Sequence, residues 1–374
     1  MLISCELTGK VLLAVMAIAG GIQLLFYWLV FRRVAFYKEQ SEASSKAPVS
    51  VIVCAKNEST NLRKFLPLLL EQDYGDYEVV VVNDCSWDDS AEYLEEMDKL
   101  HSRLKLVTIK EQERYSHGKK FALTLGIKAA SHDRLIFTDA DCRPSGKSWV
   151  TAMASKFNDN TEIVLGYGAY EKTSGFLNKL IRFDAVMIAI QYFSFAMAGN
   201  AYMGVGRNLA YRKTLFFRNK GFAKHNHLPS GDDDLLVNET ATKQNTQVCL
   251  NPESFTYSTP KTNFAAWFKQ KKRHVSTAKY YKNRHRLQLA LLGASGCLFF
   301  VSLITLYSIT CYVKLTSMIF VGVLLLKMPI FALAGVKLRE KDLILLFPIC
   351  ELLHYLLQPL FYIAQVFSKN KKWK

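Results

Sequence analysis

Four short runs of apolar and β-branched residues alternate with helix-like segments in the first half of the chain. The runs cover residues 49–55, 77–82, 104–109 and 134–138, and the helix-like segments lie near residues 59–71, 88–100 and 119–130. Parallel strands joined by crossover helices produce this order. Strands that read as continuous apolar runs are buried on both faces of their sheet. We therefore predict an α/β domain with a mostly parallel sheet.

Polar side chains follow three of these runs at the point where each run ends. Asn57 and Glu58 follow the first, Asp84 ends the second, and Asp139 and Asp141 follow the fourth. The carboxyl ends of parallel strands meet at the edge where open α/β sheets bind ligands. Asn and Asp also favour turns and helix caps. Three such endings at one edge nevertheless predict a ligand site.

Asp139 and Asp141 are separated by one residue. Alternation along an extended chain would place both on the same side. Two carboxylates that face one way repel each other unless a cation lies between them or water solvates them. A divalent metal site and a solvated acidic turn are the two interpretations. Further along, residues 116–120 open a helix with Gly118, Lys119 and Lys120, a turn suited to phosphate.

Residues 11–31 contain no charged side chain and are long enough to cross a bilayer. Arg32 and Arg33 follow directly, where a signal peptide would have a small-residue cleavage site, so we predict a retained helix. With Lys38, these arginines place its C-terminal side in the cytoplasm by the positive-inside rule. The expected location is the cell inner or plasma membrane, with the α/β domain on the cytoplasmic side.

The last part of the chain is expected to hold further spans, at residues 287–313 and 315–335. Residues 343–367 are also long enough, although they contain Pro348, Glu351, His354 and Pro359. A third crossing would put the basic tail outside, against the positive-inside rule. A proline-broken re-entrant or interfacial hairpin therefore stays open beside it. Residues 183–198 are read as an interfacial or acceptor-covering helix, or equally as a buried core helix.

The formal net charge of +16 implies an anionic partner. Lysine and arginine are dense in residues 261–286, aromatic residues lie among them, and a predicted span follows. This pattern favours a basic amphipathic helix on anionic membrane lipids rather than nucleic acid. The eight cysteines form no C-x-x-C pair, which fits a reducing compartment and favours neither zinc nor disulfides.

Four motifs follow one another in the order V-S-V-I-V-C-A-K-N-E, V-V-N-D, G-K-K-F-A-L and T-D-A-D. This order resembles the nucleotide-sugar half of a family 2 glycosyltransferase, of the membrane-bound, cellulose-synthase-like subgroup. The resemblance implies a GT-A fold and a nucleoside-diphosphate sugar as donor, with a UDP-sugar favoured. It further implies the domain order 1–33 N-terminal transmembrane helix, 34–48 linker, 49–260 GT-A domain, 261–286 interface helix, 287–367 C-terminal transmembrane region and 368–374 basic tail.

The same resemblance implies roles on the donor side. Asp84 would contact the nucleoside, Asp139 the ribose or diphosphate region, and Asp141 the metal, Mg²⁺ or Mn²⁺, with Asp139 beside it. Asn57 and Glu58 would lie next to the nucleotide, and Lys119 would bind the donor.

On the acceptor side, residues 204–213 resemble the family segment G-x-N-x-A-Y-R-K, which implies acceptor contacts for Gly206 and Asn208. Residues 230–236 stand where the family has its catalytic E-D-x-D-L. Alignment on Leu235 makes Asp232 the general base. The usual preceding Glu is Gly231 here, which leaves Asp233 as an alternative. An Asp-rich helix N-terminus, favoured by the helix dipole, is the structural interpretation of the same residues.

Gln270, Arg273 and His274 resemble the Q-x-x-R-W motif of membrane-bound polysaccharide synthases and would contact the acceptor. Histidine replaces the tryptophan that packs on the acceptor sugar, which weakens the case for processive chain growth. A basic helix face on lipid headgroups is the other interpretation. The resemblance implies a metal-dependent, inverting hexosyltransferase with a lipid-linked or glycan acceptor. A processive synthase and a non-enzymatic nucleotide-binding membrane scaffold are the alternatives.

Overall fold

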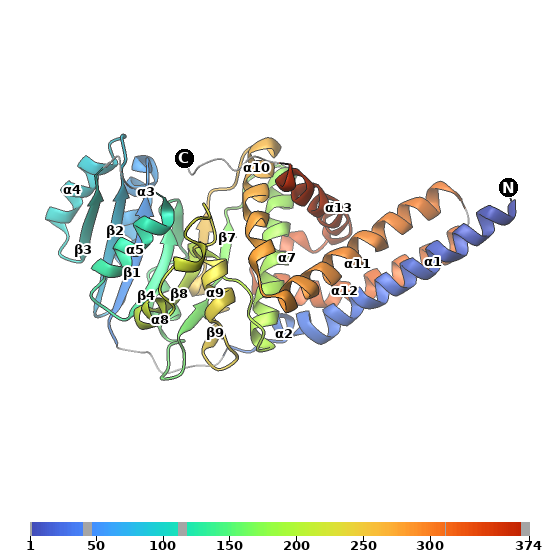
Figure 1. Cartoon of the computed structure of the whole chain (residues 1–374), viewed down its shortest axis with the longest axis horizontal. Coiled ribbons are helices and arrows are strands. Elements are labelled where there is room, and N and C mark those ends of the chain that lie inside the picture. The colour runs from blue at the N-terminus through green and yellow to red at the C-terminus, as the bar shows by residue number, and fades with distance from the viewer. Residues whose placement is uncertain (1, 40–46, 111–117, 311, 368–374) are drawn as a thin grey trace. The chain divides into compact units, whose positions relative to one another are not determined.

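A computed structural model describes residues 2–39, 47–110, 118–310 and 312–367 (Figure 1). Residues 40–46 of the predicted linker, the start of the turn at residues 116–120 and the basic tail lie outside these residues. The described residues form two compact units. The sheet unit takes Lys38–Ile181 and Phe195–Asn263, and the helical unit takes the chain up to Tyr37, Arg182–Ser194 and the chain from Phe264 onward.

Within the described ranges, seven strands of the sheet unit form one sheet in the order β3-β2-β1-β4-β8-β6-β9. Their bounds are β1 Val49–Ala55, β2 Tyr77–Asp84, β3 Leu104–Ile109, β4 Arg134–Asp139, β6 Ile163–Leu165, β8 Leu209–Arg212 and β9 Thr246–Val248. β3, β2, β1 and β4 are parallel, β8 is antiparallel to β4 and β6, and β9 is parallel to β6. The predicted mostly parallel sheet is confirmed.

A smaller sheet consists of β5 (Cys142–Pro144), β10 (Thr256–Ser258) and β7 (Gly168–Tyr170). β10 is antiparallel to β5 and parallel to β7. The sequence did not predict β5 or β10. Each has only three residues, too few to produce a periodic pattern.

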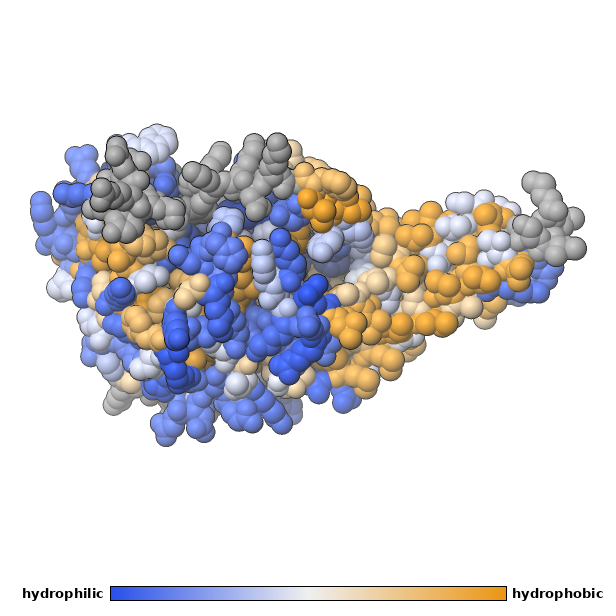
Figure 2. Space-filling view, in the orientation of Figure 1, coloured by the Kyte–Doolittle hydropathy of each residue, from blue (hydrophilic) through white to orange (hydrophobic). Residues whose placement is uncertain are grey.

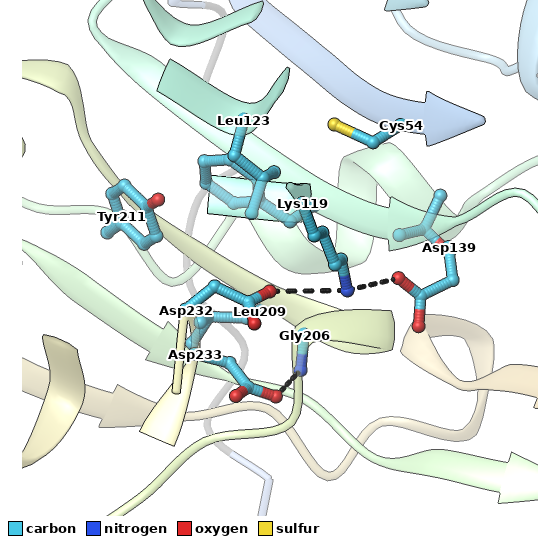
Figure 3. Close-up of a pocket in the computed structure, with 11 residues that line it drawn as sticks. Cys54, Lys119, Leu123, Asp139, Gly206, Leu209, Tyr211, Asp232 and Asp233 are labelled. Carbon is cyan, nitrogen blue, oxygen red and sulfur yellow. Dashed lines mark hydrogen bonds and ion pairs between the residues drawn. The ribbon is translucent and has the colours of Figure 1, made fainter. Parts of the chain in front are cut away.

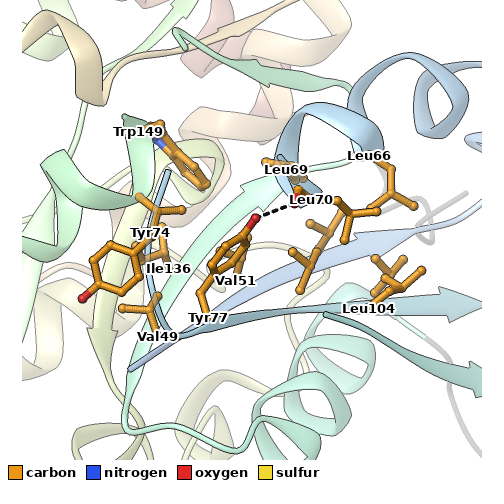
Figure 4. Close-up of a cluster of buried hydrophobic side chains, with 14 of the residues drawn as sticks. Val49, Val51, Leu66, Leu69, Leu70, Tyr74, Tyr77, Leu104, Ile136 and Trp149 are labelled. Atoms are coloured by element: carbon orange, nitrogen blue, oxygen red, sulfur yellow. Dashed lines mark hydrogen bonds between the residues drawn. The ribbon is translucent and has the colours of Figure 1, made fainter. Parts of the chain in front are cut away.

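Helices cover both faces of the large sheet. α3 (Ser59–Leu70), α4 (Ser90–Leu100) and α6 (Trp149–Ala154) share a buried cluster with Val49, Val51 and Val79 (Figure 4). α5 (Lys119–Ala129) packs against the opposite face, where a Cβ at Gly126 would lie 2.8 Å from Val82 and 3.0 Å from Ile52. The absence of a side chain at Gly126 therefore lets α5 lie close against β1 and β2. α8 (Lys213–Arg218) and α9 (Asp234–Thr240) follow later in the chain.

Long apolar helices make up most of the helical unit. They are α1 (Leu2–Leu25), which continues through a π-helical turn (Phe26–Phe31) into α2 (Arg32–Ala35), α7 (Phe176–Met197), α11 (Asn283–Ser308), α12 (Val313–Lys337) and α13 (Phe347–Val366). Five segments in the described chain are long and apolar enough to cross a membrane: Glu6–Ala35 and the helices α7, α11, α12 and α13. Exposed apolar side chains gather along α1 and α11 (Figure 2).

Two expectations change. The run at residues 183–198 belongs to α7, which begins at Phe176 and has 22 residues, so the helix is longer than predicted and is long and apolar enough to cross a membrane. Polar residues in its first turns hid the start of the helix. α13 is one continuous helix with Pro348 in its first turn and Pro359 inside. The proline-broken hairpin considered for this segment does not form.

Candidate active site

The strand register brings the predicted donor-side residues to one sheet edge. Ala55 lies opposite Asn83, and Cys54 lies opposite Asp139, so the ends of β1, β2 and β4 are level. Asp84 is fully buried at the end of β2. A pocket at this edge is lined by residues that include Cys54 and Asp139. The predicted convergence of strand ends is therefore confirmed.

Hydrogen bonds join the loops after β1 and β2. Asn57 has φ 57°, a left-handed conformation that Asn tolerates better than most residues. Its Oδ1 accepts a hydrogen bond from the Trp87 amide at 3.0 Å, and its own amide donates to Ser86 Oγ at 3.0 Å. The Glu58 carboxylate accepts a bond from Asn61 at 2.6 Å. Burial raises the pKa of Glu58.

Asp139 and Asp141 lie close together, but a turn and not an extended strand brings them there. β4 ends at Asp139, Ala140 and Asp141 form a turn, and β5 begins at Cys142, so Asp141 is not part of an extended strand. The two carboxylates and the Cys142 thiol each offer an atom within 4.8 Å of the others. Burial, and then the neighbouring Asp139, raises the pKa of Asp141.

This donor set fits a hard divalent cation. Carboxylate oxygens are the ligands that Mg²⁺ and Mn²⁺ prefer, and a diphosphate would complete such a site. The Cys142 thiol is softer, fully buried and 2.9 Å from Ser258 Oγ, so it contributes less to this fit. Asp139 and Asp141 are the residues that would hold the ion.

Lys119, the first residue of α5, lies between the donor side and the predicted base. Its Nζ is 2.8 Å from Asp139 Oδ1 and 3.2 Å from Asp232 Oδ2 (Figure 3). Burial opposes the charge of this ammonium, but Asp139, Asp232 and Asp233 raise the pKa of Lys119 well above its usual value. Lys119 therefore carries a positive charge between two carboxylates.

Asp232 and Asp233 precede α9 and have different partners. Asp233 is the N-cap residue: its Oδ1 accepts a bond from the Asp234 amide at 2.8 Å, and its Oδ2 accepts one from the Gly206 amide at 2.6 Å (Figure 3). Burial, then Asp232 and Asp234, raises the pKa of Asp233 to about 7. Asp232 instead faces Lys119.

Gly231 explains one departure from the family pattern. Its φ is 95°, in a region that L side chains rarely adopt. A glutamate at this position would be strained. The backbone at this position therefore disfavours the glutamate of the family pattern.

Of the predicted acceptor residues in the sheet unit, Gly206 contributes its amide to Asp233, whereas Asn208 is fully buried. The Asn208 amide donates to the carbonyls of Tyr167 and Ser254, and its Oδ1 accepts a bond from Trp149 Nε1. These bonds fix the segment in place. Asn208 thus has a structural role, and the prediction of a direct acceptor contact loses its support.

Gln270, Arg273 and His274 lie on α10 (Phe264–His274), which belongs to the helical unit. Their neighbour Lys271 is buried and pairs with Asp184 of α7 at 2.6 Å. His354 of α13 is 3.1 Å from the same carboxylate. The motif helix is thus fixed by an ion cluster in the helical unit that the sequence did not indicate.

Sequence reasoning also missed Arg207, between Gly206 and Asn208. Its guanidinium lies 4.2 Å from the centre of the Tyr170 ring, and Nη1 donates to Ser258 Oγ at 3.3 Å. Burial and Asp139 raise the pKa of Asp141, and the positive charge of Arg207 offsets part of that rise. A charged residue inside the G-x-N-x-A-Y-R-K segment was the signal that could have marked it.

Two family models match overlapping parts of the chain: "Glycosyl transferase family 2" over residues 50–217 and "Glycosyl transferase family group 2" over residues 139–335. An uncharacterized glycosyltransferase of Haemophilus influenzae is 32% identical over 124 residues, which cover 33% of this chain and 36% of that protein. A poly-beta-1,6-N-acetyl-D-glucosamine synthase of Staphylococcus epidermidis is 31% identical over 121 residues, 31% of this chain and 28% of that protein. The matches thus span about a third of these relatives.

A mannosyltransferase of Pyrobaculum calidifontis, solved in complex with GDP-Man and Mn²⁺, has a similar structure. The TM-score is 0.64, the sequence identity is 18%, and the match covers 97% of this chain and 99% of that one. This likeness establishes that the two chains share a GT-A type fold.

Proposed function

Because the chain belongs to the family 2 glycosyltransferases, we propose that it transfers a sugar from a nucleoside-diphosphate sugar to a lipid-linked or membrane-associated acceptor. The observation that carries this proposal is the convergence of Asp139, Asp141, Lys119 and Asp232 at the carboxyl edge of the sheet. This arrangement joins a set of metal ligands, a phosphate-binding cation and a base.

The donor would bind over the ends of β1, β2 and β4, with Asn57, Glu58 and Asp84 beside the nucleotide. Asp139 and Asp141 would hold Mg²⁺ or Mn²⁺, and Lys119 would contact the diphosphate. When bound, the cation neutralises charge that builds up on the departing nucleoside diphosphate. The GDP-Man and Mn²⁺ in the mannosyltransferase structure support this type of donor and cation. We would test UDP-sugars first.

Asp232 is the better candidate for the base. Both oxygens of Asp233 already accept backbone amides, whereas Asp232 pairs with a flexible lysine. Asp232 would take the proton from the acceptor hydroxyl, which attacks the anomeric carbon opposite the leaving group and inverts it. A positioned base typically contributes about 10²–10⁴-fold to the rate.

The acceptor would be reached at a membrane surface. Five apolar helices support membrane association, and basic residues of α10 suit anionic lipids. Arg32, Arg33 and Lys38 favour a cytoplasmic catalytic domain. The matched poly-beta-1,6-N-acetyl-D-glucosamine synthase favours a second candidate, processive synthesis of a polysaccharide. Product length separates the two: one sugar per acceptor, or a long polymer.

The first experiment is a thermal-shift screen of nucleoside-diphosphate sugars with the full chain in detergent and Mn²⁺. A donor at about 100 times its Kd should stabilise the protein by about 2.7 kcal/mol. Asp141→Asn should remove that stabilisation and abolish transfer while the protein still folds. Full activity in Asp141→Asn would contradict the metal assignment, and no stabilisation of wild type by any such donor would contradict the function itself.

A further inference from the structure

The ammonium of Lys119 touches both halves of the proposed active site at once. Figure 3 shows it between Asp139, which ends β4, and Asp232, which precedes α9. The two distances, 2.8 and 3.2 Å, are those of direct ion pairs. The Asp232 side chain is 11% exposed and that of Lys119 is 23% exposed. Because water screens such charges only in part, the pairing matters more than one at the surface.

Lys119 and a divalent cation would compete for the same carboxylate, that of Asp139. Asp139 Oδ1 is bound to the ammonium, and Asp139 also belongs to the set of atoms that fits a metal ion. A divalent cation at Asp139 and Asp141 would lie close to the lysine charge, and like charges at short range repel in a poorly screened site. A diphosphate changes this balance, because its oxygens can bind both cations.

We propose that Lys119 is the built-in counter-cation of this site: it pairs Asp139 with Asp232, excludes a divalent cation that arrives alone, and moves onto the diphosphate when donor and cation arrive together. This inference rests on the proposed function. It makes Asp232 available to an acceptor hydroxyl only after the donor has bound. Binding of the donor would thus prepare the base.

The neighbouring Lys120 holds the segment before Asp232 in place independently of Lys119. Lys120 Nζ donates to the carbonyls of His225 at 2.6 Å and Leu228 at 3.1 Å, in the segment that leads to Asp232. Those bonds hold the segment against the start of α5. The hydrogen bond of Lys119 is instead to the Asp139 side chain. A flexible four-carbon stem lets its ammonium change partner while Lys120 keeps the segment in place.

Binding of Mn²⁺ tests this idea without an acceptor or turnover. The full chain in detergent is titrated with Mn²⁺, and free Mn²⁺ is measured by electron paramagnetic resonance, with and without UDP or GDP. For the wild type, the nucleotide should tighten Mn²⁺ binding by about tenfold or more. Lys119→Met should bind Mn²⁺ alone about fivefold more tightly and bind the nucleotide more weakly. The two affinities move in opposite directions.

Other roles of Lys119 predict other results. A lysine that only contacts the diphosphate would leave the affinity for Mn²⁺ alone unchanged in Lys119→Met, and a lysine that only supports the fold would weaken both affinities. Either result overturns the inference. Lys119→Gln repeats the test with a shorter polar side chain, and Lys119→Arg keeps the charge and should keep Mn²⁺ binding weak. Lys128→Met, an exposed change on the same helix, should behave as wild type.

The proposed function can fail separately. If wild type binds Mn²⁺ with nucleotide and Asp141→Asn does not, the metal site stands whatever Lys119→Met shows. If wild type binds neither UDP nor GDP in the presence of Mn²⁺, the donor assignment fails, and the role of Lys119 fails with it.

Discussion

At the scale of single residues, neighbouring positions in this site differ because of their local partners. Asp233 is held by two backbone amides, and Asp232 by one side-chain cation. The sequence could place both at the start of a helix. Which of the two caps the helix and which faces Lys119 depends on the direction in which each carboxylate points. That direction is set by the left-handed Gly231 and by the amide of Gly206, 27 positions away from its acceptor Asp233.

Replacing Asp232 with Asn should lower the transfer rate by about 10²–10⁴-fold, because the acceptor hydroxyl loses its base. Donor binding, measured by thermal shift with Mn²⁺, should persist. The change is nearly isosteric, so the melting temperature without ligand should stay near that of wild type. Undiminished transfer in Asp232→Asn would move the base to another residue.

The pKa of Asp233 gives a prediction for stability against pH. Burial and the adjacent carboxylates raise this pKa from 3.8 to about 7, so the folded protein holds the proton more tightly than the unfolded chain. The contribution of Asp233 to stability is then fully present below about pH 4 and is lost as pH rises toward 7. Asp233→Asn cannot titrate.

Unfolding of wild type and Asp233→Asn should therefore be compared by chemical denaturation at pH 5 and pH 7.5. The difference in unfolding free energy, wild type minus variant, should be smaller at pH 7.5 than at pH 5. An unchanged difference would mean that the pKa of Asp233 is near its ordinary value.

At the scale of elements, the sequence predicted the longer helices and strands, which have a clear apolar pattern, and missed most of the three-residue strands. The strands at residues 49–55 and 104–109 were predicted with their observed bounds, and the helices α3, α4 and α5 to within two residues. β5, β6 and β9 have three residues each, and pairing across a sheet, not local pattern, makes them strands. α10 ends at His274 and gives way to a 3₁₀ segment, so the predicted interface helix at 261–286 is not one helix.

Gly126 should be sensitive to any larger side chain, because a Cβ there would meet Val82 and Ile52 of the sheet. Gly126→Val should destabilise the sheet unit by about 1–3 kcal/mol through overpacking. Lys128→Val, on the exposed side of the same helix, controls for helix propensity and should cost less than about 1 kcal/mol. Urea denaturation of both variants compares the two effects. Equal losses would mean that α5 can move away from the sheet.

At the scale of the whole molecule, charged residues among apolar helices are explained by partners on other helices. Glu351 and His354 are three residues apart on α13, but Glu351 pairs with Lys327 of α12 at 2.7 Å, and His354 with Asp184 of α7. In the sequence, both residues stand out as polar positions in an apolar segment. Their partners could not be predicted, because the pairs join helices that are far apart in the chain. Both residues are thus paired with charged residues of other helices in the helical unit.

The pair of Lys327 and Glu351 is fully buried, and Tyr27 also donates to Glu351 at 2.9 Å. Lys327→Met should destabilise the helical unit by about 3–5 kcal/mol, because it leaves a buried carboxylate without its cation. The double change Lys327→Met with Glu351→Gln should recover most of the loss. Thermal unfolding in detergent measures both. A double variant as unstable as the single one would show that packing of the lysine stem, not charge, is what matters.

One aspartate joins the two loops that would surround the nucleotide. Asp88, in the loop after β2, accepts the amide of Ser59 at the start of α3 at 3.0 Å and that of Ser90 at the start of α4 at 3.1 Å. A displacement of either helix start must stretch a bond to the same carboxylate. The two loops are therefore coupled through this carboxylate, so a nucleoside that displaced one of them would strain the hydrogen bond to the other.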